Sequence, residues 1–252
     1  MIEIAWLSGA GFRIVDSMGN VIFIDAWLDA PPGNPGRPLS VGDVKRADLV
    51  LVTHGDPGHY GRGDGVRIAA QNRCPFASSP ELCSYVLASG LIPADKVRPL
   101  PMNEAATIGA ARVQMFPAVH PPWVPPAGYP VPRDPNAGFL LTIEGSTVLF
   151  VGDAVAGDAI YSTVSAGRSP IVGLLPIGSP AGSHGTLEST ADLAAGIAAM
   201  SGMRYVIPHY NFVANNPVLP SLRAKLAAVG AELLDLAPGK AAQFENGSSR
   251  RL

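Results

Sequence analysis

The chain has 252 residues, of which 47% are hydrophobic and 15% charged, and its formal net charge is −2. This composition supplies enough apolar side chains for a buried core and excludes an extended disordered chain. The near-neutral charge, with no basic surplus and no acidic block, argues against nucleic acid as a partner. No apolar run approaches the ~18 residues that span a bilayer, and no secretory signal is recognisable, so we expect a cytoplasmic protein with no membrane partner.

The first part of the chain predicts short strands. Residues 2–7, 11–15 and 21–24 are apolar runs separated by turn residues, and residues 47–52 form a longer apolar run. Short runs of this kind, bounded by glycine, serine, asparagine and aspartate, are typical of successive strands. The run at 47–52 predicts a buried strand that ends at Thr53 and His54.

The rest of the chain predicts helices alternating with strands. Residues 80–89 read as a helix because a proline lies in the first turn and Gly90 follows as a stop. The other expected helices are the one ending at 67–70, an alanine-rich one at 189–200 and one at 221–229. The other expected strands are 112–116, a hairpin of 138–143 with 147–151, then 171–177, 205–208, and a last strand pair that starts with 232–236. Two packed sheets with helices outside would accommodate this order, and nothing indicates a linker.

The two cysteines, Cys74 and Cys83, lie in one segment with eight residues between them. A disulfide and two thiols are both open, and a reducing cytosol favours two thiols.

Histidines follow the predicted strands. The five histidines are His54, His59, His120, His184 and His209. Three of them (His54, His120 and His209) come directly after a predicted strand or its short extension, and Asp153 does the same. Strand ends of one sandwich share a rim, so these side chains are candidates for a single site, although any one of them alone is better explained as an ordinary loop residue. Neutral imidazole with carboxylate suits Zn²⁺, Mn²⁺ or Fe²⁺, and the absence of a nearby cysteine favours an active site over a structural zinc site.

Three short motifs contain most of these candidate residues. Residues 53–59 read Thr-His-Gly-Asp-Pro-Gly-His, Gly152 precedes Asp153, and Pro208 precedes His209 and Tyr210. These motifs resemble the metallo-β-lactamase superfamily. More narrowly, they resemble its branch of small metal-dependent hydrolases that includes L-ascorbate-6-phosphate lactonase. The resemblance implies an α/β fold, a four-layer αββα sandwich of two mixed β-sheets with helices outside, in one domain over residues 1–252.

The resemblance also implies a ligand set for one or two divalent ions (Zn, Mn or Fe). It assigns His54, Asp56 and His120 to one metal position, His59 and His209 to a second, and Asp153 to a bridge between them. In a hydrolase of this type Asp56 or Asp153 would hold the nucleophilic water.

Other residues are expected around that core. His184 is a candidate acid for the leaving group, and Tyr210 is a candidate oxyanion donor or a packing residue. Asp25 and Thr53 are expected to hydrogen-bond the ligand imidazoles from behind.

The chain departs from the family motif at three places. Asp56 stands where the family has its second histidine, Gly58 stands where it has an aspartate, and residues 8–10 lack a histidine often found in the opening turn. A carboxylate at position 56 favours Mn²⁺ or Fe²⁺ over Zn²⁺. Losing the carboxylate at position 58 weakens the second metal position. Asp25, Asp64 and His184 are candidates to compensate, and one ion or two of unequal affinity are both open.

The proline-rich loop 117–135 is expected to form one wall of the pocket. Trp123 and Tyr129 would contact an apolar or ring-shaped substrate, and Arg133 would hold a carboxylate or phosphate. An ordinary rigid surface loop explains these residues equally well.

Three function classes remain open at this stage. The first is hydrolysis of a small ester, lactone, amide or phosphoester. The second is an iron-dependent oxidation, because diiron members of the superfamily also carry a carboxylate at the second motif position. The third is a degenerate binding protein, which Gly58 makes credible. We expect a small-molecule partner; a homo-oligomer is a default expectation.

Overall fold

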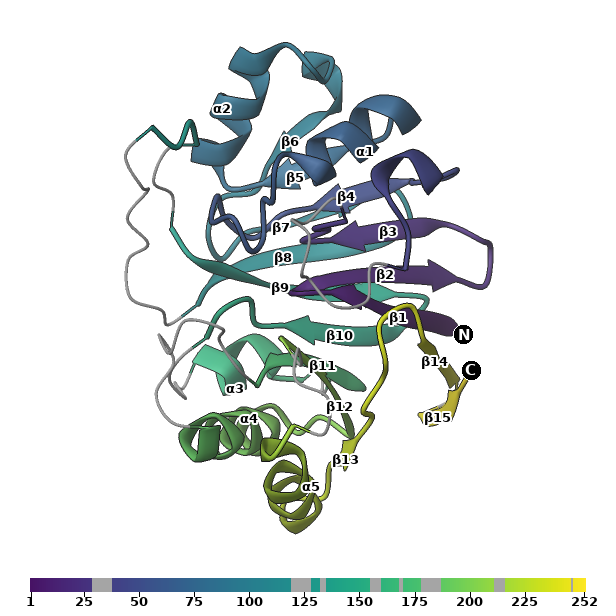
Figure 1. Ribbon diagram of the computed structural model, residues 1–252, viewed down its shortest axis with the longest axis vertical. Coiled ribbons are helices and arrows are strands. Elements are labelled where there is room, and N and C mark those ends of the chain that lie inside the picture. The colour runs from purple at the N-terminus through teal and green to yellow at the C-terminus, as the bar shows by residue number, and fades with distance from the viewer. Residues whose placement is uncertain are drawn as a thin grey trace.

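The computed structural model describes residues 1–28, 38–118, 128–131, 135–154, 160–167, 170–177, 187–210, 216–245 and 247–252. Within these ranges the strands form two sheets (Figure 1). The first has the strand order β15-β14-β1-β2-β3-β4-β5-β6, and the second β13-β12-β11-β10-β9-β8-β7.

The strands of the first sheet are mostly short. Their bounds are Ile2–Ser8 (β1), Gly11–Asp16 (β2), Val21–Ile24 (β3), Leu49–Leu51 (β4), Phe76–Ser78 (β5), Val97–Pro99 (β6), Ala241–Glu245 (β14) and Ser248–Arg251 (β15). Neighbours from β15 to β3 are antiparallel, whereas β3, β4, β5 and β6 are parallel. The sheet is therefore mixed.

The second sheet is mixed in the same way. Its bounds are Ala105–Ile108 (β7), Ala111–Pro117 (β8), Ala137–Ile143 (β9), Ser146–Phe150 (β10), Val172–Pro176 (β11), Tyr205–His209 (β12) and Glu232–Leu233 (β13). Strands β7 to β10 are antiparallel to their neighbours, and β10 to β13 are parallel. Parallel strands place their carboxyl ends at one edge of a sheet, which is where ligand sites form in sheets of this kind.

Helices cover the outer face of each sheet (Figure 1). Their bounds are Asp64–Asn72 (α1), Pro80–Ser89 (α2), Ile160–Ser165 (α3), Leu187–Ser201 (α4) and Val218–Ala228 (α5), with short 3₁₀ turns at Val41–Asp43 (η1) and Ala94–Lys96 (η2). Helices α1 and α2 pack on the first sheet, and α4 packs on β11 of the second.

Alternation along the strands explains this layering. In β3, Ile22 and Ile24 belong to the core between the two sheets, while Phe23 points into the core under α1 and α2. In β10, Phe150 faces the central core and Leu149 faces the core under α3, α4 and α5. Successive strand side chains point to opposite faces, so strands that are apolar throughout must be covered on both sides. The four-layer αββα architecture is thereby confirmed.

Several element boundaries differ from the prediction. Helix α1 ends at Asn72, slightly beyond the end predicted at residues 67–70, where Arg73 takes a left-handed conformation and stops it. Residues 232–236 do not open the last strand pair: β13 has two residues and joins the second sheet beside β12, and the last pair is β14 with β15. The three-residue strands β5 and β6 were missed because so few residues carry no periodicity.

No helix within the described residues is long and apolar enough to cross a membrane. Cys74 and Cys83 are both buried free thiols, as the prediction favoured.

Candidate metal centre

The candidate centre lies where strand ends of the two sheets meet. Strand β4 runs into Thr53 and His54, and β10 runs through Gly152 into Asp153. Strand β12 ends at His209, and Tyr210 follows it. Hydrophobic strands thus fix the backbone immediately before each polar side chain, and the polar groups emerge at one rim.

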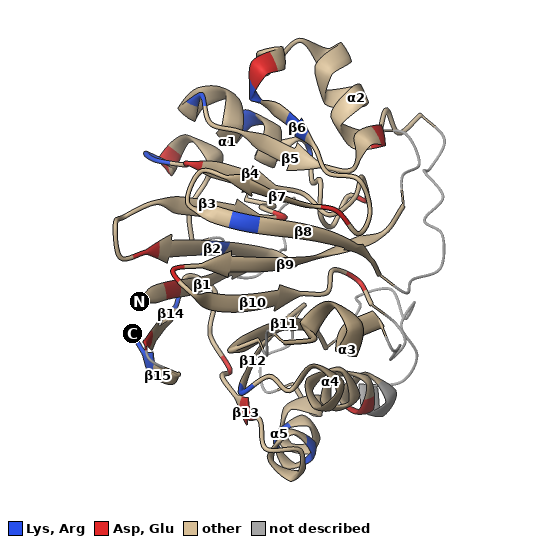
Figure 2. Ribbon diagram, turned by 180° about the vertical axis from the view of Figure 1, so that it is seen from behind, with Lys and Arg blue, Asp and Glu red and all other residues tan. Residues whose placement is uncertain are grey.

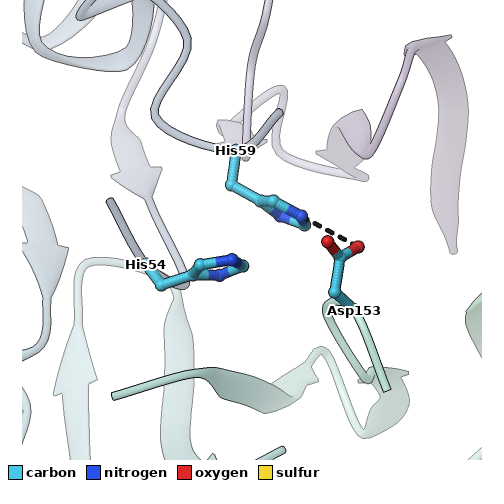
Figure 3. A group of neighbouring side chains, drawn as sticks. All are labelled: His54, His59 and Asp153. Carbon is cyan, nitrogen blue, oxygen red and sulfur yellow. Dashed lines mark ion pairs between the residues drawn. The ribbon is translucent and has the colours of Figure 1, made fainter. Parts of the chain in front are cut away.

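Three side chains converge at this rim. His54, His59 and Asp153 each offer a ligand atom, and these atoms all lie within 4.8 Å of one another. The two imidazole rings have centroids 4.1 Å apart, and both point toward the carboxylate of Asp153 (Figure 3). His54 and His59 come from the first sheet and Asp153 from the second, so the group spans the sandwich.

Asp25 fixes the ring of His59 from behind. Its Oδ2 lies 2.6 Å from His59 Nδ1, while His59 Nε2 faces Oδ1 of Asp153 at 2.9 Å. Asp25 follows β3 and has a φ of 44°, in the left-handed region that few residues other than glycine adopt. A carboxylate on one ring nitrogen sets the tautomer and leaves the other nitrogen directed into the centre.

Thr53 connects Asp25 to both histidines. The backbone N–H and the hydroxyl of Thr53 both donate to the carboxylate of Asp25, at 2.7 Å each. The Thr53 oxygen also lies 3.0 Å from Nδ1 of His54 and 3.2 Å from Nδ1 of His59. Asp25 and Thr53 therefore lie behind the two imidazoles, where the sequence analysis expected them.

The charges of the centre stabilise one another. Burial alone would lower the pKa of His59, but the carboxylates of Asp153 and Asp25 outweigh it and raise that pKa well above its usual value. Burial alone would raise the pKa of Asp153, but the histidines, His59 foremost, hold it well below its usual range. A carboxylate that stays ionised in a buried place is suited to a cation.

His209 and Tyr210 close the centre on the side of the second sheet. The ring of His209 packs against Phe12 and Phe150, with centroids 6.0 and 5.5 Å away. The hydroxyl of Tyr210 lies 2.7 Å from Nε2 of His59. Burial, followed by the nearby carboxylates of Asp153, Asp56 and Asp25, raises the pKa of Tyr210 well above its usual value.

The other two predicted carboxylates, Asp56 and Asp64, have hydrogen-bond partners outside the group of His54, His59 and Asp153. Asp56 is half-buried, and its Oδ1 accepts the N–H of Gly58 at 2.7 Å, so this oxygen shapes the loop 54–59. Asp64 is fully buried at the start of α1, and its carboxylate accepts the Leu28 N–H at 2.7 Å and pairs with Arg67 at 3.2 Å. Among the described residues, the close group of possible ligands contains neither of them and does not contain His209.

Of the three side chains predicted to contact substrate from the pocket wall, Tyr129 is the one that the structure describes. Its hydroxyl lies 3.2 Å from the carbonyl oxygen of Gly55 and 3.3 Å from that of Gly61, so it fastens its own loop to the loop 54–59. The other predicted wall and site residues, His120, Trp123, Arg133 and His184, lie outside the described residues.

The sequence analysis missed the packing that orients His209. Phe12 on β2 and Phe150 on β10 face the central core, and both pack against the ring. The apolar alternation of these strands was readable, but which of their residues would meet His209 depends on how the two sheets are stacked.

The donor set fits a divalent ion. Two imidazoles and a carboxylate, all buried, are ligands that Zn²⁺, Mn²⁺ and Fe²⁺ accept, and the hydrogen bonds behind His59 are those that metal-binding histidines usually have.

Comparison with known proteins agrees with this geometry. The family model of the β-lactamase superfamily domain matches residues 20–210, which hold the described members of the centre. The chain belongs to the β-lactamase superfamily.

Relatives narrow the assignment within the superfamily. A UPF0173 metal-dependent hydrolase from Archaeoglobus fulgidus is 31% identical over 254 residues, which cover 96% of this chain and 99% of the relative. The chain therefore belongs to the UPF0173 metal-dependent hydrolases, and the predicted enzyme class and metal dependence are confirmed at the level of the family. The likeness to the ascorbate-phosphate lactonase branch stays a resemblance.

Solved structures confirm the fold. The metallo-hydrolase Igni18 from Ignicoccus hospitalis has a TM-score of 0.75 at 22% identity, over 97% of this chain and 98% of that chain. CmlA, a diiron β-hydroxylase from Streptomyces venezuelae, has a TM-score of 0.70 at 14% identity, over 100% of this chain and 54% of its own. These identities support the fold alone.

Proposed function

We propose that this superfamily member hydrolyses a small ester, lactone, amide or phosphoester by means of a water activated at the His54–His59–Asp153 centre. The observation that carries the proposal is the convergence of these three buried ligand groups within 4.8 Å, from both sheets, with Asp25 behind His59. Membership of a family of metal-dependent hydrolases supports the reaction class. A divalent ion held there supplies Lewis acidity and lowers the pKa of a water molecule at the site.

The residues of the chain have distinct parts in this reaction. His54, His59 and Asp153 hold the ion, and Asp25 and Thr53 keep the two imidazoles in place. The Asp153 carboxylate, whose pKa is held low by the histidines, remains able to accept a hydrogen bond from the attacking water.

A small molecule is the proposed substrate. Figure 2 shows positive and negative residues scattered over the described elements without a basic stripe, which a nucleic-acid surface would need. Lactones and phosphoesters are among the proposed substrates because of the sequence resemblance. A homo-oligomer is the proposed state of assembly, as a default for proteins of this kind.

Metal content and hydrolysis, measured together, test the proposal. Protein purified without an affinity tag is analysed for metal by plasma mass spectrometry, beside His54→Ala and Asp153→Ala. We expect one or two equivalents of Zn, Mn or Fe in the parent and a loss in both variants. The loaded parent is then screened with chromogenic esters, lactones, amides and phosphoesters. Asp48→Asn, which alters a surface carboxylate paired with Arg46, is the matched control. A parent that takes up no metal would identify a degenerate binding protein instead.

An iron-dependent oxidation is the second candidate. Two histidines and one carboxylate are also the ligand type of mononuclear non-haem iron oxygenases, and Asp56 adds a further carboxylate to the loop 54–59. Iron as the resident metal, together with O₂ consumption and no hydrolysis in the screen, would favour this function over the first.

A further inference from the structure

Position 58 has no side chain, and the structure gives a specific reason. A Cβ atom built on Gly58 would lie 2.9 Å from the hydroxyl oxygen of Tyr210 and 3.2 Å from Oδ1 of Asp56. The backbone does not demand glycine here, because Gly58 is not among the glycines with positive φ. The glycine is therefore explained by the tyrosine that reaches over it.

Tyr210 is held firmly in that place. It directly follows β12, and its φ of 60° turns the chain into the left-handed region. Its backbone N–H donates to the carbonyl oxygen of Gly9 at 3.1 Å, and the same oxygen accepts the indole N–H of Trp6 at 3.0 Å. The opening turn at residues 8–10, which lacks the family's histidine, thus anchors the tyrosine.

The Tyr210 oxygen faces the nitrogen of His59 that points into the centre. Asp25 occupies the other nitrogen, Nδ1, at 2.6 Å. Around Nε2 lie the Tyr210 oxygen at 2.7 Å and Oδ1 of Asp153 at 2.9 Å. Both oxygens therefore lie within 3 Å of this nitrogen, and a side chain at position 58 would begin 2.9 Å from the Tyr210 oxygen.

We propose that Tyr210 replaces the missing aspartate and that its phenolic oxygen is a ligand of the metal position served by His59 and Asp153. This inference rests on the proposed metal-dependent function. On ligation the hydroxyl gives its proton to solvent, and the oxygen supplies the negative charge that a carboxylate at 58 would supply. Gly58 and Tyr210 then form a coupled pair. A side chain at position 58 would displace the Tyr210 oxygen, and the Tyr210 oxygen leaves no room for a side chain at position 58.

The coupling is tested with Tyr210→Phe, Gly58→Asp and the double variant. The metal-free proteins are titrated with Co²⁺ alone, and binding is followed by cobalt absorbance, by metal content, and by the ultraviolet difference spectrum of ionised tyrosine. Tyr205→Phe is the matched control, because Tyr205 begins β12, the strand that Tyr210 follows, and its hydroxyl faces the carbonyl of Gly247 at 3.4 Å.

The parent should show the tyrosinate signal as cobalt binds. Tyr210→Phe should lose the signal and bind at least about tenfold more weakly, because the loss of even a supporting group costs this much. Gly58→Asp should also lose the signal, since the new side chain displaces Tyr210. The double variant should recover most of the affinity without the signal, while Tyr205→Phe should match the parent.

Two outcomes separate the failures. If the parent binds cobalt but gives no tyrosinate signal, ligation by the Tyr210 oxygen is overturned while the metal centre stands, whatever the affinity of Tyr210→Phe. If the parent binds no metal, the proposed function fails and this inference fails with it. The parent's own signal decides the matter even if a variant does not fold.

Discussion

At the scale of single residues, the candidate ligands of the centre are held in place by hydrogen bonds from other buried polar residues. Asp25 has a backbone conformation that costs free energy, and yet its carboxylate meets the Thr53 N–H, the Thr53 hydroxyl and His59. Left-handed conformations outside glycine persist where the surroundings fix them, and they gather at functional sites. Asp25 and Tyr210, both left-handed, contact the two nitrogens of the same His59 ring.

Replacing Asp25 by asparagine tests that support. Asparagine tolerates the left-handed backbone but offers His59 only one oxygen, without charge. We expect Asp25→Asn to fold normally and to bind Zn²⁺ or Mn²⁺ about 10–100-fold more weakly than the parent. Competition with a fluorescent chelator measures the change, and Asp48→Asn serves as the control. Unchanged affinity would mean that Asp25 only supports the loop.

The thiols make a second prediction at this scale. Burial raises the pKa of Cys74 to about 11 and that of Cys83 to about 12. The thiolate is the reactive form, so at pH 8 a raised pKa leaves almost none of it. Ellman's reagent should therefore label neither cysteine in the native protein within minutes and both after denaturation in guanidinium chloride. Fast native labelling of either thiol would contradict the burial of that residue.

At the scale of elements, the long strands and helices were predictable and the short connections were not. The hairpin of β9 and β10 and the strand β12 carry enough apolar alternation and turn residues to be read from the sequence. The three-residue strands β5 and β6 exist because neighbours offer them hydrogen bonds, and this depends on tertiary structure. The sequence also predicts that His54, Asp153 and His209 follow the ends of strands. The close approach of Tyr210 to Gly58 could not be predicted, because it depends on how the two sheets stack.

Gly152 joins β10 to the centre and gives a prediction about this element. Its φ is 58°, and a Cβ there would lie 2.4 Å from the carbonyl oxygen of Ala137 on β9. Gly152→Ala adds strain and a backbone clash, so we expect a loss of about 3 kcal/mol or more in the free energy of unfolding. Gly145→Ala is the matched control: its φ is 78° with open space around the added atom, so strain alone should cost about 1 kcal/mol. Urea unfolding compares the two, and equal losses would show that the clash relaxes freely.

At the scale of the whole molecule, the centre ties the two sheets together. His54 and His59 follow the first sheet and Asp153 follows the second, and the same two sheets enclose the central core. An ion held by residues of both sheets binds only when the sandwich is assembled, so its binding free energy adds to the stability of the fold.

Metal removal should therefore lower the thermal stability of the whole fold. A ligand that binds only the folded state, at about 100 times its Kd, stabilises it by about 2.7 kcal/mol. In a chain of 252 residues this corresponds to a rise in Tm of roughly 5–10 °C. Calorimetric scans with Mn²⁺ or Zn²⁺ and with chelator should show that difference for the parent and none for His54→Ala, which lacks a ligand from the first sheet. An equal shift in both proteins would place the stabilising ion elsewhere on the molecule, because removing one member of the centre would then have left its binding intact.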